Sequence, residues 1–469
     1  MKKNNIILIL LVVFAASLFI RSESFKKKHS LSYDESVYPR IAVQIIKNPA
    51  EYNTVNLYNS ELKNGRKLPA YFAKPLFKHP PLFIYLVKIS LQLFGLSYIP
   101  AFWVSLVFGA LLILLAYDWG RVLFGENIGL YAAILMAIEP NAWITSQKIW
   151  METTLAFFSV LSLCLFTRAV KKYNPYVMIA GGVAAGLAAL TKYPGIIPAG
   201  CIFIYAACFE RSLFKRKAFI FSLLVPFIMM VPWAVWNYKV YGAGIFSSLQ
   251  SDGNVKRFFG NVIRFNLIYY AVGIAAVLFA ASRSGLLSRV KLFLSSRGRA
   301  LYAFLAAFLI AGFSVLFAGY IRNALDIRYI PPTGWITGMF NAEPWGFYTW
   351  KIMELSPLYI FSYLAFFTAA FDAKKYKEYL LVFIPSAVLM IFWVAWGAYQ
   401  SRYIVALSVP MMILASRSQF LLFEWIRKIE NKNLNLAARG LLFAVIAYFI
   451  FKTLLVDINL ALPNTACYY

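Results

Sequence analysis

About thirteen apolar runs that could cross a bilayer as helices divide this chain of 469 residues. A transmembrane helix needs about 20 mostly apolar residues. Soluble domains contain about 25% charged residues and do not repeat such runs, whereas here only 14% of the residues are charged and 61% are hydrophobic. The sequence therefore predicts an all-α polytopic membrane protein, with residues 1–469 in a single membrane-embedded domain. The runs lie near residues 5–20, 100–117, 127–141, 153–167, 176–190, 194–209, 218–236, 265–282, 300–319, 355–371, 379–396, 402–416 and 439–457.

Cysteine and charge usage narrow the class of protein further. The four cysteines show no paired spacing and three of them lie inside apolar runs, so neither a disulfide framework nor a zinc site is indicated. The formal net charge is +27, but most basic residues occupy short loops between apolar runs. This distribution reports topology rather than a nucleic-acid surface, and we expect no nucleic-acid partner. The N-terminal run is expected to be a retained first span, because no clear cleavage site follows its small residues.

The basic residues also predict which loops face the cytoplasm, because loops rich in Lys and Arg stay on that side of the membrane. The basic loops share one side only if the stretch Pro81–Gly95 does not span. This stretch is short and has Lys88 at its middle, so we interpret it as a helix that lies on the outer membrane surface. The protein is thus predicted to be multi-pass in the plasma (cytoplasmic) membrane. Its larger extracytoplasmic loops are expected near residues 21–99, 238–264 and 320–354.

Charged residues gather at the predicted outer boundary. Taken singly, an acid there can be a first-turn helix residue, and a lysine or arginine can be an ordinary interfacial side chain. Taken together, a carboxylate can act as a general base, cations can hold a phosphate, and aromatic side chains can stack on a sugar or line a channel for a prenyl chain. The combination fits group transfer from a lipid phosphate in the outer leaflet. The charged residues are Asp34 and Glu35 in HSLSYDESVYPRIA, Glu152 in SQKIWMETTLAFF, Lys192 in ALTKYPGII and Arg402 in YQSRYIVALSVP.

Six stretches, in this order along the chain, resemble the GT-C glycosyltransferases. The resemblance is closest to the branch that contains the protein O-mannosyltransferases and the lipid A aminoarabinose transferases, and it covers nearly the whole chain. It implies a GT-C fold with about 13 transmembrane helices and a large first outer loop with juxtamembrane helices. It also implies an inverting enzyme that moves a hexosyl or pentosyl group from a polyprenyl-phosphate donor to an acceptor on the extracytoplasmic face. The stretches are YDESVYPRIA, FKHPPLFIYLVKISLQLFG, QKIWMETTLAFF, ALTKYPG, EPWGFYTW and QSRYIVALSVP.

The resemblance implies a role for individual residues by position. The implied catalytic residues are Asp34, Glu35 and Glu152. Asp34 matches the acid that deprotonates or orients the acceptor, as the general base, and Glu35 is its companion, for which the resemblance suggests help in binding the acceptor or a metal. Glu152 matches the second-loop acid, which is usually an aspartate in the family. Lys78 and His79 precede Pro-Pro, where the aminoarabinose transferases have a lysine and the mannosyltransferases a histidine, so this motif does not separate the two branches. The implied phosphate-binding residues are Lys78, His79, Lys192 and Arg402, and the substrate-lining candidates are Tyr33, Tyr38, Trp345, Tyr348 and Tyr403.

Several features stay open at this level. The sugar can be a hexose or an aminosugar, the acceptor can be a lipid, a glycan or a protein, and the outer-face acids permit a divalent metal without requiring one. A membrane transporter or lipid-linked glycan flippase is the alternative function. Transporters place ionisable residues near the bilayer midplane and show internal repeats, whereas here the charges gather at the outer boundary and no repeat is detected. The sequence therefore favours an enzyme that works among membrane lipids.

Overall fold

The computed structural model describes residues 3–26, 31–65, 68, 70–242, 348, 352–353, 355–396 and 400–461, and every element in these ranges is a helix. The predicted spans near 265–282 and 300–319, and most of the predicted loops 238–264 and 320–354, lie outside the described residues. The helices are α1 (Lys3–Lys26), α2 (Tyr33–Lys47), α3 (Val55–Lys63), η1 (Ala70–Ala73), α4 (Leu82–Phe94), α5 (Tyr98–Phe124), α6 (Glu126–Ala137), α7 (Pro140–Ser146), α8 (Met151–Lys171), α9 (Pro175–Thr191), η2 (Tyr193–Ile196), α10 (Ile197–Phe209), η3 (Arg211–Lys215), α11 (Lys217–Tyr241), α18 (Tyr359–Phe371), η5 (Ala373–Lys375), α19 (Tyr376–Trp396), η6 (Ser401–Ile404), α20 (Val405–Ile426) and α21 (Lys432–Ala461).

The described helices confirm the prediction of an all-α polytopic membrane fold. Seven of them are long and apolar enough to cross a bilayer, or up to eight if the bent pair α6–α7 counts as one span. Further predicted spans coincide with shorter apolar helices, among them α9 and α18. The exact number of spans stays a prediction. The sequence did not predict the bend of 57° between α6 and α7, where Pro140 restarts the helix and the Glu139 carboxylate accepts hydrogen bonds from the backbone N–H groups of Asn141 and Ala142.

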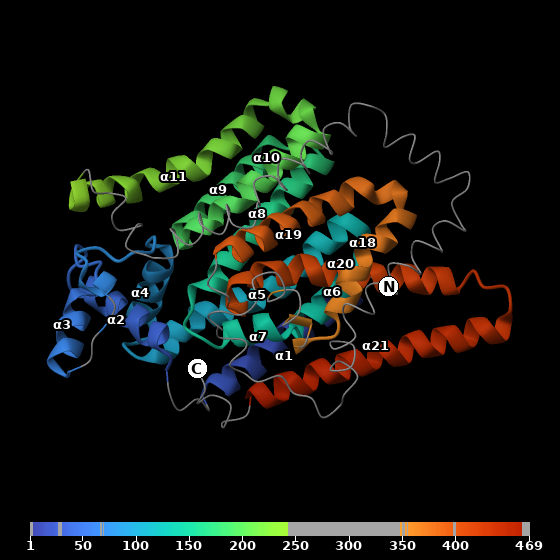
Figure 1. Cartoon of the computed structure of the whole chain (residues 1–469), viewed down its shortest axis with the longest axis horizontal. Helices are drawn as coiled ribbons and strands as arrows, with labels where there is room; N and C mark the ends of the chain where they lie inside the picture. The colour runs from blue at the N-terminus through green and yellow to red at the C-terminus, as the bar shows by residue number, and fades with distance from the viewer. Residues whose placement is uncertain are drawn as a thin grey trace.

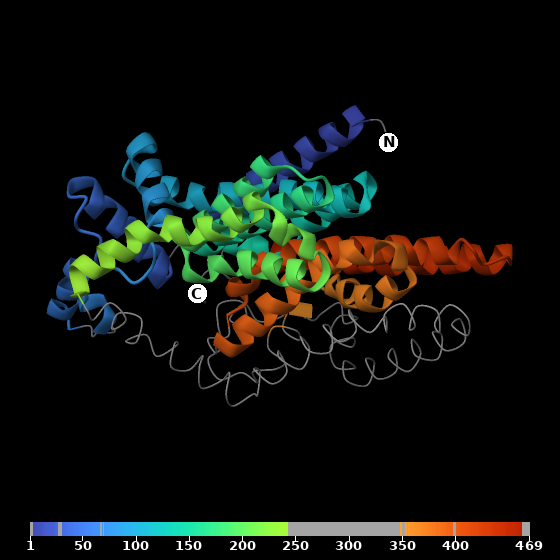
Figure 2. The same ribbon diagram turned by 90° about the horizontal axis from the view of Figure 1, so that it is seen from above.

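The bundle has two chemically different ends. Helices α2, α3 and α4 gather at one end, and the connection from α20 to α21 lies at the other (Figures 1 and 2). At this second end, ion pairs connect residues at or near the helix ends that flank the basic loops. Arg168 pairs with Asp118, Arg417 with Asp372, Lys171 with Glu378 at 3.0 Å, and Lys377 with Glu210 at 2.8 Å. Within the described ranges, the loops that the charge pattern assigns to the cytoplasm therefore meet at one end, which is the arrangement that the positive-inside rule requires.

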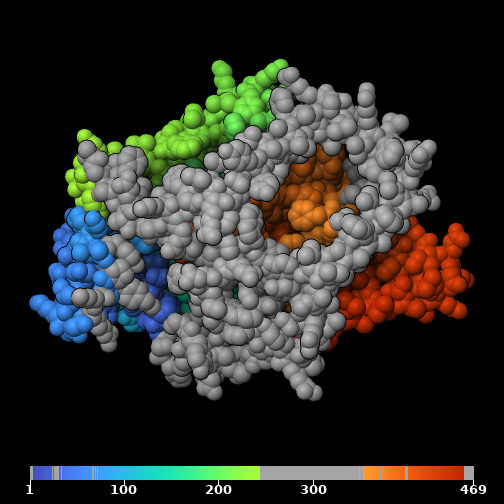
Figure 3. Space-filling view, in the orientation of Figure 1, coloured from blue at the N-terminus to red at the C-terminus, as the bar shows by residue number. Residues whose placement is uncertain are grey.

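Helix α4 folds back onto α2 instead of extending α5. Its 13 residues rise about 20 Å, less than the roughly 30 Å of a bilayer core. One face of α4, including Phe83 and Val87, packs into a hydrophobic cluster with Tyr38 of α2 and Trp233 of α11. This cluster fixes the segment between α1 and α5 against the membrane helices. Figure 3 shows the loop helices in blue at the end of the molecule opposite the red α21.

Close backbone contact determines how α9 crosses α11. A Cβ atom built on Gly182 of α9 would lie 2.3 Å from the Ser222 carbonyl oxygen of α11 and 2.9 Å from its Cα. No side chain can be accommodated at this contact without separation of the two helices. Because Lys192 follows α9 directly, this crossing also helps to place the residues described below.

We therefore expect Gly182→Ala to lower the midpoint of thermal unfolding of the detergent-purified protein, by the equivalent of about 1–3 kcal/mol, as for other overpacked cores. Gly200→Ala on α10 is the matched control, because no atom of another described segment lies within 4 Å of its added Cβ and alanine is the better helix former. Equal midpoints for the two variants would contradict this account of the crossing.

Candidate functional site

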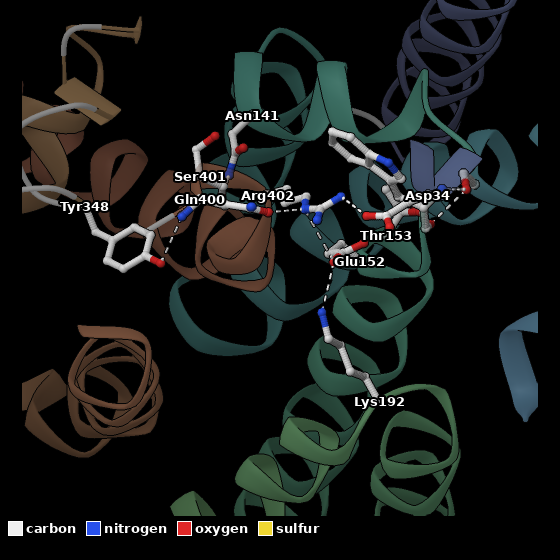
Figure 4. A network of polar contacts seen from close by, with 11 residues as sticks. Asp34, Asn141, Glu152, Thr153, Lys192, Tyr348, Gln400, Ser401 and Arg402 are labelled. Atoms are coloured by element: carbon white, nitrogen blue, oxygen red, sulfur yellow. Dashed lines mark hydrogen bonds and ion pairs between the residues drawn. The ribbon is translucent and has the colours of Figure 1, made fainter. Parts of the chain in front are cut away.

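Four charged side chains from distant parts of the chain form a single network at the α2–α4 end of the bundle (Figure 4). The Arg402 Nη1 atom lies 2.9 Å from Asp34 Oδ2, and the Arg402 Nε atom lies 3.8 Å from Glu152 Oε1. The same Glu152 oxygen lies 3.0 Å from Lys192 Nζ. We call Asp34, Glu152, Lys192 and Arg402 the charge network. The structure thus brings together four of the residues that the sequence predicts for the site.

Burial makes the members of the charge network depend on one another. The Glu152 side chain is 2% exposed, those of Lys192 and Arg402 are 12% exposed, and that of Asp34 is 34% exposed. Buried charges are tolerated when they are paired, and two carboxylates balance two cations here. Asp34 is the member most open to a second reactant. The Glu152 Oε2 atom is buried and accepts no hydrogen bond from the described part of the chain, so within that part the network retains an unused acceptor.

Asp34 and Glu35 are adjacent in sequence but have different surroundings. Both lie in the first turn of α2. The Glu35 side chain is fully buried, its Oε2 accepts a hydrogen bond from the Ser32 backbone N–H at 2.8 Å, and its Oε1 accepts one from the Ile149 N–H at 3.2 Å. Lys148 Nζ lies 3.9 Å from Oε2. Glu35 therefore connects the start of α2 to the segment before Glu152, while Asp34 contacts Arg402.

The short helix η6 and its neighbours orient Arg402. Its Nε donates a hydrogen bond to Gln400 Oε1 at 2.6 Å, and its guanidinium lies over the Trp150 ring, 4.5 Å from the centroid. The buried Asn141 of α7 donates from Nδ2 to the Ser401 carbonyl at 2.9 Å, which holds the backbone beside Arg402. The guanidinium plane is thus fixed by a hydrogen bond, a ring and an anchored backbone.

Lys192 lies in a tight turn after α9. The Gly195 N–H donates to the Lys192 carbonyl at 2.8 Å, and a Cβ on Gly195 would come within 2.3 Å of backbone atoms of Ala188 and Ala189. The sequence TKYPG therefore folds directly back onto α9. The Lys192 ammonium lies over the Tyr403 ring, 4.4 Å from the centroid, so it faces η6 as well as Glu152.

His79 lies near the charge network in a partly buried position. Burial lowers the pKa of its imidazole well below the usual value, and the positive charges of Lys78, Lys192 and Arg402 lower this pKa further. The side chain is therefore neutral near pH 7. It can donate or accept a hydrogen bond, but it does not add a positive charge to the site.

The aromatic candidates differ in where they lie. Tyr38 is buried, and burial together with the nearby negative charges of Asp34 and Glu152 raises the pKa of its hydroxyl. The Tyr348 hydroxyl accepts a hydrogen bond from the Gln400 N–H at 3.4 Å. Tyr403 stacks on Trp393 with centroids 4.8 Å apart. Three of the predicted substrate-lining residues therefore surround the network. Tyr33 begins α2, but its side chain, like the whole of Trp345, lies outside the described residues.

Two supporting residues, Gln400 and Asn141, were not predicted from the sequence. Gln400 is the first residue of the motif QSRYIVALSVP that contains Arg402, and this position was the only available signal. Asn141 follows Glu139-Pro140 and has no sequence feature that distinguishes it from a helix-capping residue. Their contribution depends on contacts between α7 and η6, which are 260 positions apart in the chain.

The described residues contain no group of three or more His, Cys, Asp or Glu side chains that could hold a metal ion. The carboxylates of Asp34 and Glu152 face Arg402 and Lys192 instead. Within this part of the chain, side-chain cations supply the positive charge of the site.

Comparison with known sequences supports the family resemblance over part of the chain. Residues 78–236 match the family model described as dolichyl-phosphate-mannose-protein mannosyltransferase. An uncharacterized protein of Aquifex aeolicus (strain VF5) is 26% identical over 220 residues, which cover 45% of this chain and 49% of that protein. The chain therefore matches about half the length of this relative.

Solved structures of two membrane glycosyltransferases have similar folds. The archaeal oligosaccharyltransferase AglB from Archaeoglobus fulgidus, in complex with an inhibitory peptide and a dolichol-phosphate, matches with a TM-score of 0.56 and 18% identity, over 96% of this chain and 56% of that chain. ArnT from Cupriavidus metallidurans, bound to undecaprenyl phosphate, matches with a TM-score of 0.51 and 14% identity, over 98% and 76% of the two chains. Both are GT-C superfamily enzymes. The predicted resemblance is therefore confirmed: this integral membrane protein has the GT-C fold.

Proposed function

We propose that the protein is a glycosyltransferase that moves a sugar from a polyprenyl-phosphate donor to an acceptor on the extracytoplasmic face, with inversion at the anomeric carbon. The observation that carries the proposal is the charge network, which joins Asp34, Glu152, Lys192 and Arg402 at one end of a GT-C fold. The family match over residues 78–236 supports the same reaction class.

The cations of the network suit a leaving phosphate. When the bond between sugar and phosphate breaks, negative charge grows on the phosphate, and fixed positive groups lower the barrier because they need no reorganisation at that moment. In this proposal Arg402 presents its planar guanidinium to two phosphate oxygens, Lys192 contributes a second charge, and the neutral His79 donates a hydrogen bond. Glu152 keeps Lys192 in place while the phosphate is absent.

Asp34 suits the general base. It is the most exposed carboxylate of the network, so an acceptor hydroxyl or amine can approach it from outside the bundle. The acceptor atom attacks the anomeric carbon from the side opposite the phosphate, Asp34 takes its proton, and the bond to the phosphate oxygen breaks. Arrival of the phosphate gives Arg402 a new partner and leaves Asp34 free for the acceptor.

The first test is transfer by the purified protein, given a panel of polyprenyl-phosphate sugars that includes mannose and an aminosugar. We expect release or transfer of the sugar from at least one donor. A chain that moves intact donor lipid between leaflets of a vesicle and cleaves none of the panel would instead be a flippase.

Asp34→Asn should lower the transfer rate by about 10²–10⁴-fold, the usual contribution of a general base, while donor affinity changes little. Both quantities are measured on the same preparation, by labelled sugar transfer and by donor binding. Glu51→Gln is the matched control, since Glu51 lies in the same loop and its carboxylate contacts Asn48 rather than the network. An Asp34→Asn variant with normal turnover would exclude this residue as the base.

Arg402→Lys should weaken donor binding by about 10- to 100-fold, because lysine keeps the charge beside Glu152 but cannot form the bidentate hydrogen bonds of a guanidinium with a phosphate. Arg40→Lys is the control, since Arg40 is exposed on α2. The measurement is equilibrium binding of a polyprenyl phosphate without its sugar. Unchanged affinity in Arg402→Lys would remove this residue from the phosphate site.

Donor binding should not follow a histidine titration between about pH 6 and about pH 8. The lowered pKa of His79 means that the imidazole stays neutral as the pH passes the usual histidine value of about 6.5. Binding that needed an imidazolium would weaken as the pH rises through that value. The non-titrating variant His79→Gln should have the same pH profile as the wild type, and a step that disappears in this variant would contradict the prediction.

A further inference from the structure

A second candidate binding site lies far from the charge network. Helices α6, α20 and α21 enclose a groove of about 700 Å³. Most of its lining is apolar, as at Leu130, Ile446 and Ile450, and its polar lining includes Tyr131 and Gln419. Gln419 follows Arg402 by 17 positions, about 25 Å along a helix, so the groove is separate from the proposed phosphate site.

Gln419 carries an unused hydrogen-bond donor at this groove. The residue is 1% exposed, its Oε1 accepts a hydrogen bond from the Tyr131 hydroxyl at 2.5 Å, and its Nε2 has no partner among the residues that the structure describes. A buried amide N–H without a partner is unfavourable, because it has lost its hydrogen bond to water and gained no other. The Nε2 atom is buried as the structure stands, so an oxygen atom of a molecule in the groove would satisfy this group once the Gln419 amide turns toward the groove.

The groove has the length of one membrane leaflet and ends beside a cation. Its lining on α21 runs from Phe443 to Leu454, which is about 16 Å of helix rise, or half of a roughly 30 Å bilayer core. Arg439 lies one turn before Phe443, so it continues the same face of α21 toward the α20–α21 turn. Arg439 is exposed, and none of the residues that the structure describes forms an ion pair with it.

We propose that this groove binds an anionic glycerophospholipid of the leaflet opposite the charge network. One acyl chain lies along α21, an ester carbonyl accepts a hydrogen bond from Gln419 Nε2, and the headgroup phosphate pairs with Arg439. The apolar lining, the unpaired amide and the terminal arginine follow the order of chemical groups along such a lipid. This inference does not depend on the proposed transfer reaction.

Thermal unfolding of the full-length protein in detergent tests the site, with phosphatidylglycerol and phosphatidylcholine of identical acyl chains as probes. Phosphatidylglycerol should raise the midpoint saturably and bind more tightly than phosphatidylcholine. Arg439→Gln should weaken phosphatidylglycerol binding about fivefold, the effect of one basic residue near an anionic headgroup. Gln419→Leu should weaken both lipids by about 2- to 10-fold, the effect of one hydrogen bond.

Lys217→Gln is the matched control, because Lys217 is an exposed basic residue at the start of α11, away from the groove. A second measurement on the wild-type protein guards against variants that fold poorly: a phosphatidylglycerol with a photoreactive acyl chain should crosslink to α6, α20 or α21 within the groove lining. Equal stabilisation by the two lipids, a loss of selectivity as large in Lys217→Gln as in Arg439→Gln, or crosslinks confined to other helices would overturn the proposal.

Discussion

The candidate site depends on one arginine that is shared by two carboxylates. Arg402 reaches Asp34 from one side of its guanidinium and Glu152 from the other, and Lys192 completes the charge balance. In a mostly buried setting, removal of any one charge leaves another without compensation, which costs several kcal/mol. The network therefore constrains four separate elements to meet at one point. These elements are α2, α8, the turn after α9 and η6.

The ion pairs that stabilise the charge network also involve the groups that the proposed sugar transfer uses. A polyprenyl phosphate brings negative charge to a site that already holds two acids, so the cations must be able to exchange partners. Glu152 Oε2, which has no partner among the described residues, and the partly exposed Asp34 indicate where the network has capacity for such an exchange. Glu35 and Asn141, by contrast, hold backbone segments and are buried. In the proposal these two residues keep the reactive groups in position without taking part in the reaction.

The helical membrane fold and the charged residues of the candidate site could be predicted from the sequence, because they depend on local or periodic patterns. Apolar runs predict the spanning helices, and the clustering of basic loops predicts their alternating direction. Asp34, Glu152, Lys192 and Arg402 were each identified as charges at a membrane boundary. Their pairing could not be predicted, since Asp34 and Arg402 lie 368 positions apart and only the packed bundle brings them together.

Three further features depend on burial and therefore escaped sequence analysis. Arg21 follows an apolar run and suggests a membrane boundary, yet it is buried and donates hydrogen bonds to Ser146 Oγ and to the Ala137 carbonyl, both at 3.1 Å. The break between α6 and α7 arises from the Glu139 cap. His79 was expected among phosphate-binding residues without a statement of its charge. Its neutral form follows from burial, which lowers the pKa of the imidazole, and then from the cations around it.

A cryo-electron microscopy structure of the protein with a bound polyprenyl phosphate tests the central claim most directly. The account predicts that the phosphate lies within hydrogen-bond distance of the Arg402 guanidinium and the Lys192 ammonium, with the Asp34 carboxylate on the far side of the space where the sugar would sit. A phosphate bound elsewhere, with the ion pair between Arg402 and Asp34 intact, would contradict it.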